Sequence, residues 1–164
     1  MICVRPSILD DAKSLAPRLR TADLREIEAC LGKHPLIVLE QGIEISNPCY
    51  TIVGEESAPL AIFGVVPDTA NPGVGRVWML ASTELLRHRF WFLRNSRKWV
   101  ELLQQQYKVL WNFIDARNEV HIEWLRWCNF NFINRVEEHG HERRPFYEFE
   151  KVAYSGRENE KGEM

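Results

Sequence analysis

The chain has 164 residues, 45% of them apolar, and a formal net charge of −2. This composition supports one hydrophobic core of ordinary domain size and argues against a disordered chain. It gives no electrostatic reason to expect nucleic acid or an anionic membrane as a partner, and no run approaches the roughly 18 apolar residues of a membrane span.

The sequence also lacks the marks of secretion. Its four cysteines form no CxxC pair, and its first residues carry Arg5, Pro6 and Asp10 where a signal peptide would need an apolar segment. We therefore predict reduced cysteines and a cytoplasmic protein. Residues 1–153 are expected to form one domain, and residues 154–164, which have almost no apolar content, a flexible tail.

The N-terminal residues predict a short strand followed by helices. The run Ile2–Val4 is β-prone, and the next stretch is expected to begin a helix with Ser7 as its N-cap and Asp10 in an imperfect capping box. Pro17 interrupts this helical stretch, and Gly32 is placed to end it. The restart of the helix is expected at Thr21 or Asp23.

The segment Pro35–Ile45 allows two interpretations. Its β-branched residues suggest a strand, whereas Pro35 in a first-turn position and the spacing of Leu36, Leu39 and Ile43 suggest a short helix, which we favour. Beyond it, two further helices are expected, over 83–106 and 118–127. The remaining strands are predicted at 50–53, 60–66, 77–81, 109–114, 130–133 and 146–152.

This order of elements predicts an α/β protein with a central mixed sheet, antiparallel at first and then a βαβ unit, with helices on both faces. A nucleotide-binding doubly wound fold would need stricter alternation. The sequence also has no GxGxxG or GxxxxGK[ST] motif to anchor one.

The same order resembles the GNAT (GCN5-related N-acetyltransferase) fold, and the segment VLWNFIDARNEVHIEWLRWCNF at 109–130 carries the specific similarity. GNAT proteins have there a strand followed by N-x-x-A-x-x-x-Y-x-x-x-G-F. The corresponding residues in this chain are Asn118, His121, Leu125, Asn129 and Phe130. Asn129 is a sensible replacement for glycine, because a helix C-terminus needs a left-handed residue.

Several phrases are more narrowly similar to the GNAT-like internal virion protein family of short-tailed bacteriophages. They are LAPRLRTADLREIEA, LAIFGVVP, GVGRVWMLAS, and the ordered series FLRNSRKW, WNFIDARN and IEWLRW. The resemblance covers roughly positions 4 to 150. It implies a GNAT-like fold and a location in the host cytoplasm or in the virion, with other virion proteins as partners.

The GNAT resemblance implies acetyl-CoA as a cofactor and an amine as the acceptor. The strand residues Met79, Leu80 and Ala81 would then contact the pantetheine arm. Working GNATs hold the pyrophosphate with a glycine-rich turn, but here no glycine occurs between Ser82 and Phe90. The side chains that could bind phosphate instead, or form only a solvated helix face, are Arg87, His88 and Arg89.

Candidate catalytic residues follow from the same resemblance. Asn118 would lie near the pantetheine or the thioester oxygen, although an asparagine at this place also caps helices. Asp115, Glu84 and Glu40 are candidate bases for the amine, and each is equally compatible with a solvated carboxylate. Leu125 stands where many GNATs have the tyrosine that protonates the leaving thiolate, and leucine donates no proton.

Two other patterns have plainer explanations. The His139-Gly140-His141 sequence suggests a polar turn between strands, because no further metal ligands stand at a recognisable spacing, so we predict no metal. Trp99, flanked by basic residues, fits either core packing or a partner surface.

Three functions remain open from the sequence. The first is N-acyl transfer from acetyl-CoA to an amine, and the second is a non-catalytic virion or interaction module on the same fold. The third, a small-molecule binder with neither role, has the least support. An open splay between the strands at 76–81 and 109–115 would favour the first, whereas a filled cleft with an exposed Trp99 would favour the second.

Overall fold

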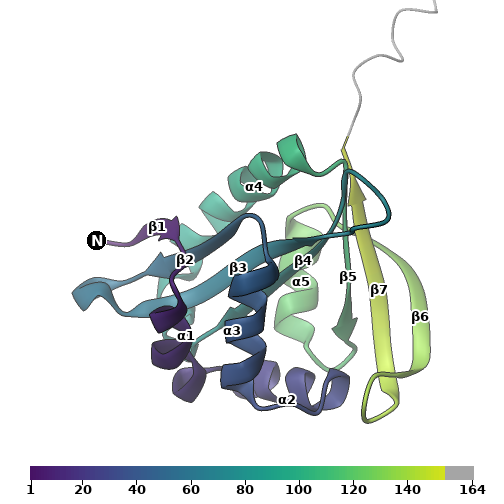
Figure 1. The fold of residues 1–164 in the computed structure, drawn as a ribbon, viewed down its shortest axis with the longest axis horizontal. Helices are drawn as coiled ribbons and strands as arrows, with labels where there is room; N and C mark the ends of the chain where they lie inside the picture. Colours follow the sequence, from purple (N-terminus) through teal and green to yellow (C-terminus); the bar gives the residue numbers. More distant parts are fainter. Residues whose placement is uncertain (154–164) are drawn as a thin grey trace, which may run out of the picture.

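The computed structural model describes residues 1–153, and the predicted tail at 154–164 lies outside the described residues. All strands of the described chain belong to one sheet with the order β1-β2-β3-β4-β5-β7-β6 (Figure 1). Their bounds are β1 Cys3–Pro6, β2 Cys49–Val53, β3 Pro59–Pro67, β4 Val74–Ala81, β5 Val109–Asp115, β6 Asn131–His139 and β7 Arg144–Val152.

Helices cover both faces of this sheet, as the sequence predicts. Figure 1 shows α3 in front of the sheet and α5 behind it. The α-helices are α1 Leu9–Leu15, α2 Thr21–Cys30, α3 Pro35–Ile45, α4 Arg89–Gln106 and α5 Glu119–Trp127, with 3₁₀ turns η1 Ala16–Arg18, η2 Glu55–Ser57 and η3 Thr83–His88. No helix within residues 1–153 is both long enough and apolar enough to cross a bilayer.

The alternation of side chains along β4 separates the two layers. Leu80 packs with the apolar residues of α1, α2 and α3, whereas Ala81 packs on the opposite face with Leu85 and Phe92. On β5, Leu110 and Ile114 pack against α4 and α5. A side chain on either strand therefore reaches one layer of helices or the other.

The helix at 35–45 confirms the favoured interpretation, and the restart at Thr21 is also confirmed. The predicted cap of the first helix is wrong by one residue. Ile8 occupies the N-cap position, and the Asp11 carboxylate accepts a hydrogen bond of 3.0 Å from the Ile8 N–H. Ser7 instead shares a 2.8 Å hydrogen bond with the Thr51 hydroxyl of β2.

The long helix expected over 83–106 is divided in the structure. Its first six residues form the 3₁₀ turn η3, and the α-helix begins only at Arg89. Ser82 is held at the end of β3, where its N–H donates to the Leu60 carbonyl over 2.8 Å, and Leu85 is buried in the core beneath. Both anchors tie this segment to the sheet before the helix can start.

The parallel pair β4–β5 is paired over only three residues of each strand. The pairs are Val74 with Val109, Gly75 with Leu110 and Arg76 with Trp111. Beyond Arg76 the two strands diverge, so the sheet opens into the splay that the sequence analysis made a criterion for the cofactor-binding hypothesis.

The turn between β6 and β7 packs against the end of α2. The His141 N–H donates to the Cys30 carbonyl and the Glu142 N–H to the Ala29 carbonyl, over 3.1 and 2.9 Å. Gly140, at a φ of +75°, lies so close that an added Cβ would stand 2.7 Å from the Ala29 oxygen. This contact fixes α2 beside the open end of the splay.

Candidate functional site

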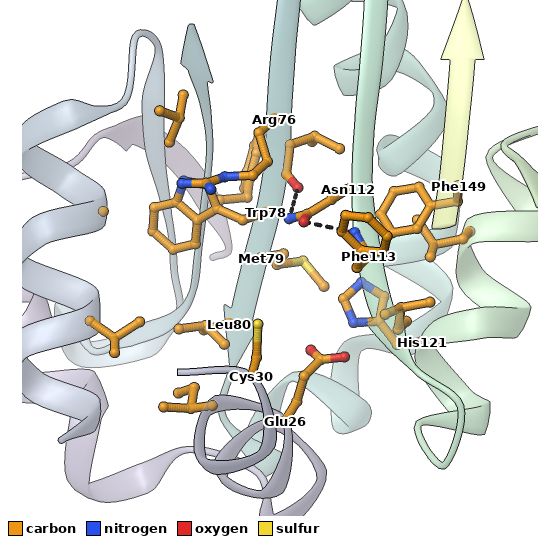
Figure 2. Close-up of a pocket in the computed structure, with 18 of the residues that line it drawn as sticks. Glu26, Cys30, Arg76, Trp78, Met79, Leu80, Asn112, Phe113, His121 and Phe149 are labelled. Carbon is orange, nitrogen blue, oxygen red and sulfur yellow. Dashed lines mark hydrogen bonds between the residues drawn. The ribbon is translucent and has the colours of Figure 1, made fainter. Parts of the chain in front are cut away.

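A cavity of about 320 Å³ occupies the splay between β4 and β5, and residues from the helices on both faces of the sheet line it. This volume lies at the lower end of the range of small-molecule sites. The polar and sulfur-containing side chains in its lining include Glu26, Cys30, Arg76, Met79, Asn112 and His121 (Figure 2).

Asn112 closes the narrow end of the splay. Its Nδ2 donates to the Val77 carbonyl of β4 over 2.9 Å, while its Oδ1 accepts a 2.7 Å hydrogen bond from the Phe113 N–H of β5 (Figure 2). The side chain therefore replaces one rung of the interrupted ladder. The sequence analysis did not single out Asn112, since an asparagine within a buried strand has no signature of such a bridge.

Helix α2 closes the open end of the splay by bonding to both strands. The Ala81 N–H of β4 donates to Asp23 Oδ2 over 2.9 Å, and the Asp115 N–H of β5 donates to Glu26 Oε1 over 2.7 Å. Arg20 completes the junction, because its N–H donates to the Ala81 carbonyl and its guanidinium pairs with Asp23. The gap between the strands is thus bounded by α2 at one end and Asn112 at the other.

Met79 lies between these two closures. Since the backbone groups of Val77 and Ala81 point across the splay, alternation places the Met79 N–H and carbonyl on the same open edge. The β4–β5 ladder has already ended at Arg76, so β5 offers these groups no partner. The peptide groups of Met79 are therefore free to bind a ligand in the cavity.

Glu26 projects from α2 into the cavity and is half-buried there (Figure 2). Burial raises its pKa to about 8. The nearby Asp23 and Asp115 carboxylates also raise this pKa, whereas the hydrogen bond from the Asp115 N–H lowers it. The ionised form of this carboxyl, whose fraction grows as the pH approaches 8, can accept a proton from an ammonium group. Glu26 shares a helix face with the buried Ile27 and with Asp23, and a carboxyl on an apolar face is the signal that sequence reasoning missed.

His121 of α5 lies beside Glu26 in the same cavity (Figure 2). Burial lowers its pKa to about 4, so the imidazole is neutral at pH 7. Its Nδ1 is buried without a hydrogen-bond partner among the described residues, as are Trp124 Nε1 and both polar atoms of the Asn118 amide. Since buried polar atoms are normally satisfied, these groups along α5 indicate a site for a polar ligand.

The donor atoms of Asp23, Glu26 and His121 lie within 4.8 Å of one another, a spacing compatible with a metal ion. However, the Asp23 carboxylate already accepts hydrogen bonds from Arg20 and from the Ala81 N–H. The group is explained more fully as a buried acid–base cluster. His139 lies elsewhere, with its ring stacked on Phe113 at a centroid distance of 4.2 Å.

The structure separates the carboxylates considered as bases. Burial opposes the ionisation of Asp115, but the hydrogen bonds and charge of Arg117 outweigh it and hold the pKa of Asp115 below its ordinary value. Glu84 is exposed on η3 with Arg18 at 3.6 Å. Glu40 is half-buried on α3 outside the cavity lining.

The expected cofactor contacts fall into two groups. Leu80 lines the cavity with its side chain, but its backbone belongs to the β3 ladder, and both backbone groups of Ala81 bond to α2. Met79 alone of these three presents free peptide groups. The basic residues Arg87, His88 and Arg89 stand where η3 passes into α4, with both arginines exposed.

Asn118 occupies the N-cap position of α5, yet its side chain makes no capping hydrogen bond. Its amide is buried without a hydrogen-bond partner among the described residues, and Asn118 is absent from the cavity lining. The hydrogen bond expected of a capping asparagine is not observed. Trp99 is half-buried in an aromatic cluster, stacked on Phe63 at 5.2 Å and close to Trp91 and Phe92. Core packing therefore explains Trp99 better than a partner surface.

No protein-family profile matches the sequence, and no curated protein does. The resemblance to the phage internal virion proteins thus gains no support from comparison. Solved structures, in contrast, match along almost the whole chain. A GNAT-family acetyltransferase from Streptococcus pneumoniae aligns with 94% of this chain and 100% of its own, at 12% identity and a TM-score of 0.62.

Two further matches have a TM-score of 0.66. A ribosomal-protein-alanine N-acetyltransferase from Brucella melitensis covers 92% of this chain and 99% of its own at 14% identity. The NatC complex bound to Gag peptide and CoA covers 93% and 99% at 13% identity. The predicted fold class is therefore confirmed: the chain has the GNAT fold, with a mixed seven-stranded sheet.

Proposed function

We propose that this protein transfers an acyl group, acetyl in the simplest case, from acyl-CoA to the nitrogen of an amine. The observation that carries the proposal is the cavity in the β4–β5 splay, where the free Met79 peptide groups lie between the strands and the Glu26 carboxyl faces the same space. A hydrogen-bond donor for the thioester carbonyl oxygen and a base for the amine are the two requirements of such a reaction.

The residues present suit acyl-CoA, although they would hold its phosphates with side chains, whereas other GNAT proteins use the backbone of a glycine-rich turn. The Met79 N–H and carbonyl would hold the pantetheine arm, with the unpartnered amide of Asn118 at the start of α5. Arg87, His88 and Arg89 would bind the phosphates with side chains, because η3 has no glycines to expose its backbone. When bound, acyl-CoA would supply the activated thioester carbonyl.

Glu26 would act as the base. Its Oε1 is held by the Asp115 N–H, so the carboxyl is oriented before any substrate arrives. With a pKa of about 8, it takes a proton from an ammonium group more readily than an ordinary glutamate would.

His121 would assist Glu26 in moving the proton. A neutral imidazole accepts at one nitrogen and donates from the other, and His121 is kept neutral by its burial. Leu125, at the position of the family's tyrosine, is buried in the core and can take no part in proton transfer. His121, one helical turn earlier, faces the cavity that Leu125 also lines.

Acceptor-dependent release of CoA thiol from acetyl-CoA tests this proposal, with wild type compared with Glu26→Gln over a pH range. Glutamine can keep the hydrogen bond from the Asp115 N–H but cannot accept the proton. We expect the wild-type rate to rise with pH to a plateau above about 8, and the variant to lose about 10²-fold and this pH dependence. Glu28→Gln, on the exposed face of the same helix, is the matched control.

A second candidate function is a non-catalytic interaction module with proteins as partners, among which the sequence resemblance suggests virion proteins. The missing glycines of η3 and the buried Leu125 favour it. The same assay separates the two: a wild-type protein that releases no thiol with any amine would contradict catalysis, and an unchanged Glu26→Gln rate would contradict the role of Glu26.

A further inference from the structure

The charges around the cavity are unevenly distributed. Glu26 is the carboxyl in its lining, and it lies inside beside His121. Lys33 and Arg76 are the basic residues of the lining, and both are exposed. Neither forms a salt bridge with any other residue between 1 and 153, so two cations stand without counterions at the same cavity.

Arg76 belongs to the side of the cavity that α2 and α3 cover. It shares a face of β4 with Trp78, whose Nε1 donates to the Ser46 hydroxyl just beyond α3 (Figure 2). Cys30, Glu26 and Arg76 all line this cavity, and burial raises the pKa of the Cys30 thiol. Glu26 and Arg76 therefore flank one continuous space.

The carboxylates on the same side do not neutralise this pair of cations. Glu148 and Glu150 lie on the same face of the sheet as Arg76. They belong to β7, however, which is separated from β4 by β5, and they are absent from the cavity lining. Glu40 and Glu44 of α3 are also absent from it. A polyamine or another polycation would meet uncompensated positive charge at this entrance.

Apolar side chains form much of the rest of the cavity lining. They include Leu31, Val38, Ile45, Trp78 and Phe113. An acceptor that fills this space needs an amine for Glu26, an anionic group for Arg76 and an apolar body between or beside them.

From this arrangement we infer that the acceptor is an amino acid, whose amine lies at Glu26 and whose carboxylate pairs with Arg76. A guanidinium binds a carboxylate through two parallel hydrogen bonds, which gives Arg76 the main role, with Lys33 adding charge. The inference rests on the proposed function for the transfer step, but it concerns recognition, which binding alone can measure.

Matched pairs of ligands test it on the full-length protein by calorimetry without acyl-CoA. Each pair compares an amino acid with its decarboxylated amine: L-phenylalanine with phenethylamine, L-leucine with isoamylamine, and 4-aminobutyrate with propylamine. We expect at least one amino acid to bind about tenfold more tightly than its amine, and Arg76→Gln to remove this preference. Arg94→Gln, an exposed arginine of α4 outside the cavity, is the control and should retain it.

The outcomes distinguish this inference from the proposed function. If no amino acid binds more tightly than its amine, or if Arg76→Gln keeps the preference, the inference is overturned. If wild type acetylates the amines as fast as the amino acids, acyl transfer stands and carboxylate recognition falls. A carboxylate preference in binding, lost in Arg76→Gln, without any thiol release from acetyl-CoA supports the recognition site and overturns acyl transfer.

Discussion

Glu26 and His121 are neighbours in the cavity, and their pKa values are displaced in opposite directions. Burial raises the pKa of the glutamate to about 8 and lowers that of the histidine to about 4. Both groups are therefore largely neutral near pH 7, which avoids isolated charge in an apolar space. Glu26 must therefore lose its proton before it can act as the proposed base, so the rate of transfer should rise as the pH approaches 8.

These shifts predict how stability depends on pH. The folded protein holds the Glu26 proton up to about pH 8, so its contribution is present below the unfolded value and is lost as pH rises from about 4.5 to 8. Glu26→Gln should flatten this decline, which urea unfolding across that range would measure. A variant curve parallel to that of wild type would contradict the shift.

The histidine predicts the opposite dependence of stability on pH, a loss on the acid side (the acid limb of the stability curve), whereas Glu26 causes the loss on the alkaline side (the alkaline limb). The pKa of His121 is depressed on folding, so the protein loses stability as pH falls from about 6.5 towards 4. His121→Gln should flatten the acid limb by up to a few kcal/mol while leaving the alkaline limb in place. An unchanged acid limb in the variant would show that His121 does not titrate as its burial implies.

At this scale the sequence predicted residues whose role is local. Asn129 has a φ of +64° and Gly32 a φ of +61°, as their positions after helices indicate. Glu26 and His121 were missed because their chemistry arises from contact between α2 and α5, which are far apart in the chain. His121 was noted only as a replacement for alanine.

At the scale of elements, α2 joins the two diverging strands β4 and β5 through side-chain hydrogen bonds at the open end of the splay. Asp23 and Arg20 bind β4 at Ala81, while Glu26 binds β5 at Asp115. Arg20 and Asp23 are nearly or fully buried as an ion pair at 2.8 Å. Side chains of α2 therefore supply hydrogen bonds to the two strands where the β4–β5 backbone hydrogen bonds are missing.

Removal of this junction has a predictable cost. Asp23→Ala leaves the Arg20 guanidinium and the Ala81 N–H without their acceptor, and should lower the free energy of unfolding by about 3 kcal/mol. Hydrogen exchange should also accelerate at the Ala81 amide. Glu28→Ala, on the exposed side of α2, should change stability by no more than about 0.5 kcal/mol. Equal losses in both variants would contradict the bridging role.

Sequence periodicity predicted most helices, but not where α4 begins. The pattern at 83–106 is helical throughout, and only the attachment of Ser82 and Leu85 to the sheet shows why η3 precedes the α-helix. Such an attachment is tertiary and leaves no mark in local spacing. The same holds for Asn112, whose amide bridges β4 and β5 at the point where the ladder between them is interrupted.

For the whole molecule, the order of elements predicted the mixed sheet with helices on both faces, and structural comparison confirms it. The splay of β4 and β5, the cavity within it and the packed Trp99 favour N-acyl transfer over the non-catalytic interaction module. What the order of elements could not give was the acceptor side, which depends on how α2, α3 and the β6–β7 turn meet.

Calorimetric titration with acetyl-CoA tests the central claim most directly, with wild type compared with an Arg87→Ala/Arg89→Ala variant. Arg94→Ala/Lys98→Ala, which removes the same charge from an exposed part of α4, is the control. The account predicts a dissociation constant in roughly the micromolar range for wild type and control, weakened about tenfold or more in the Arg87/Arg89 variant. Absence of binding to wild type would contradict an acyl-CoA site in the splay.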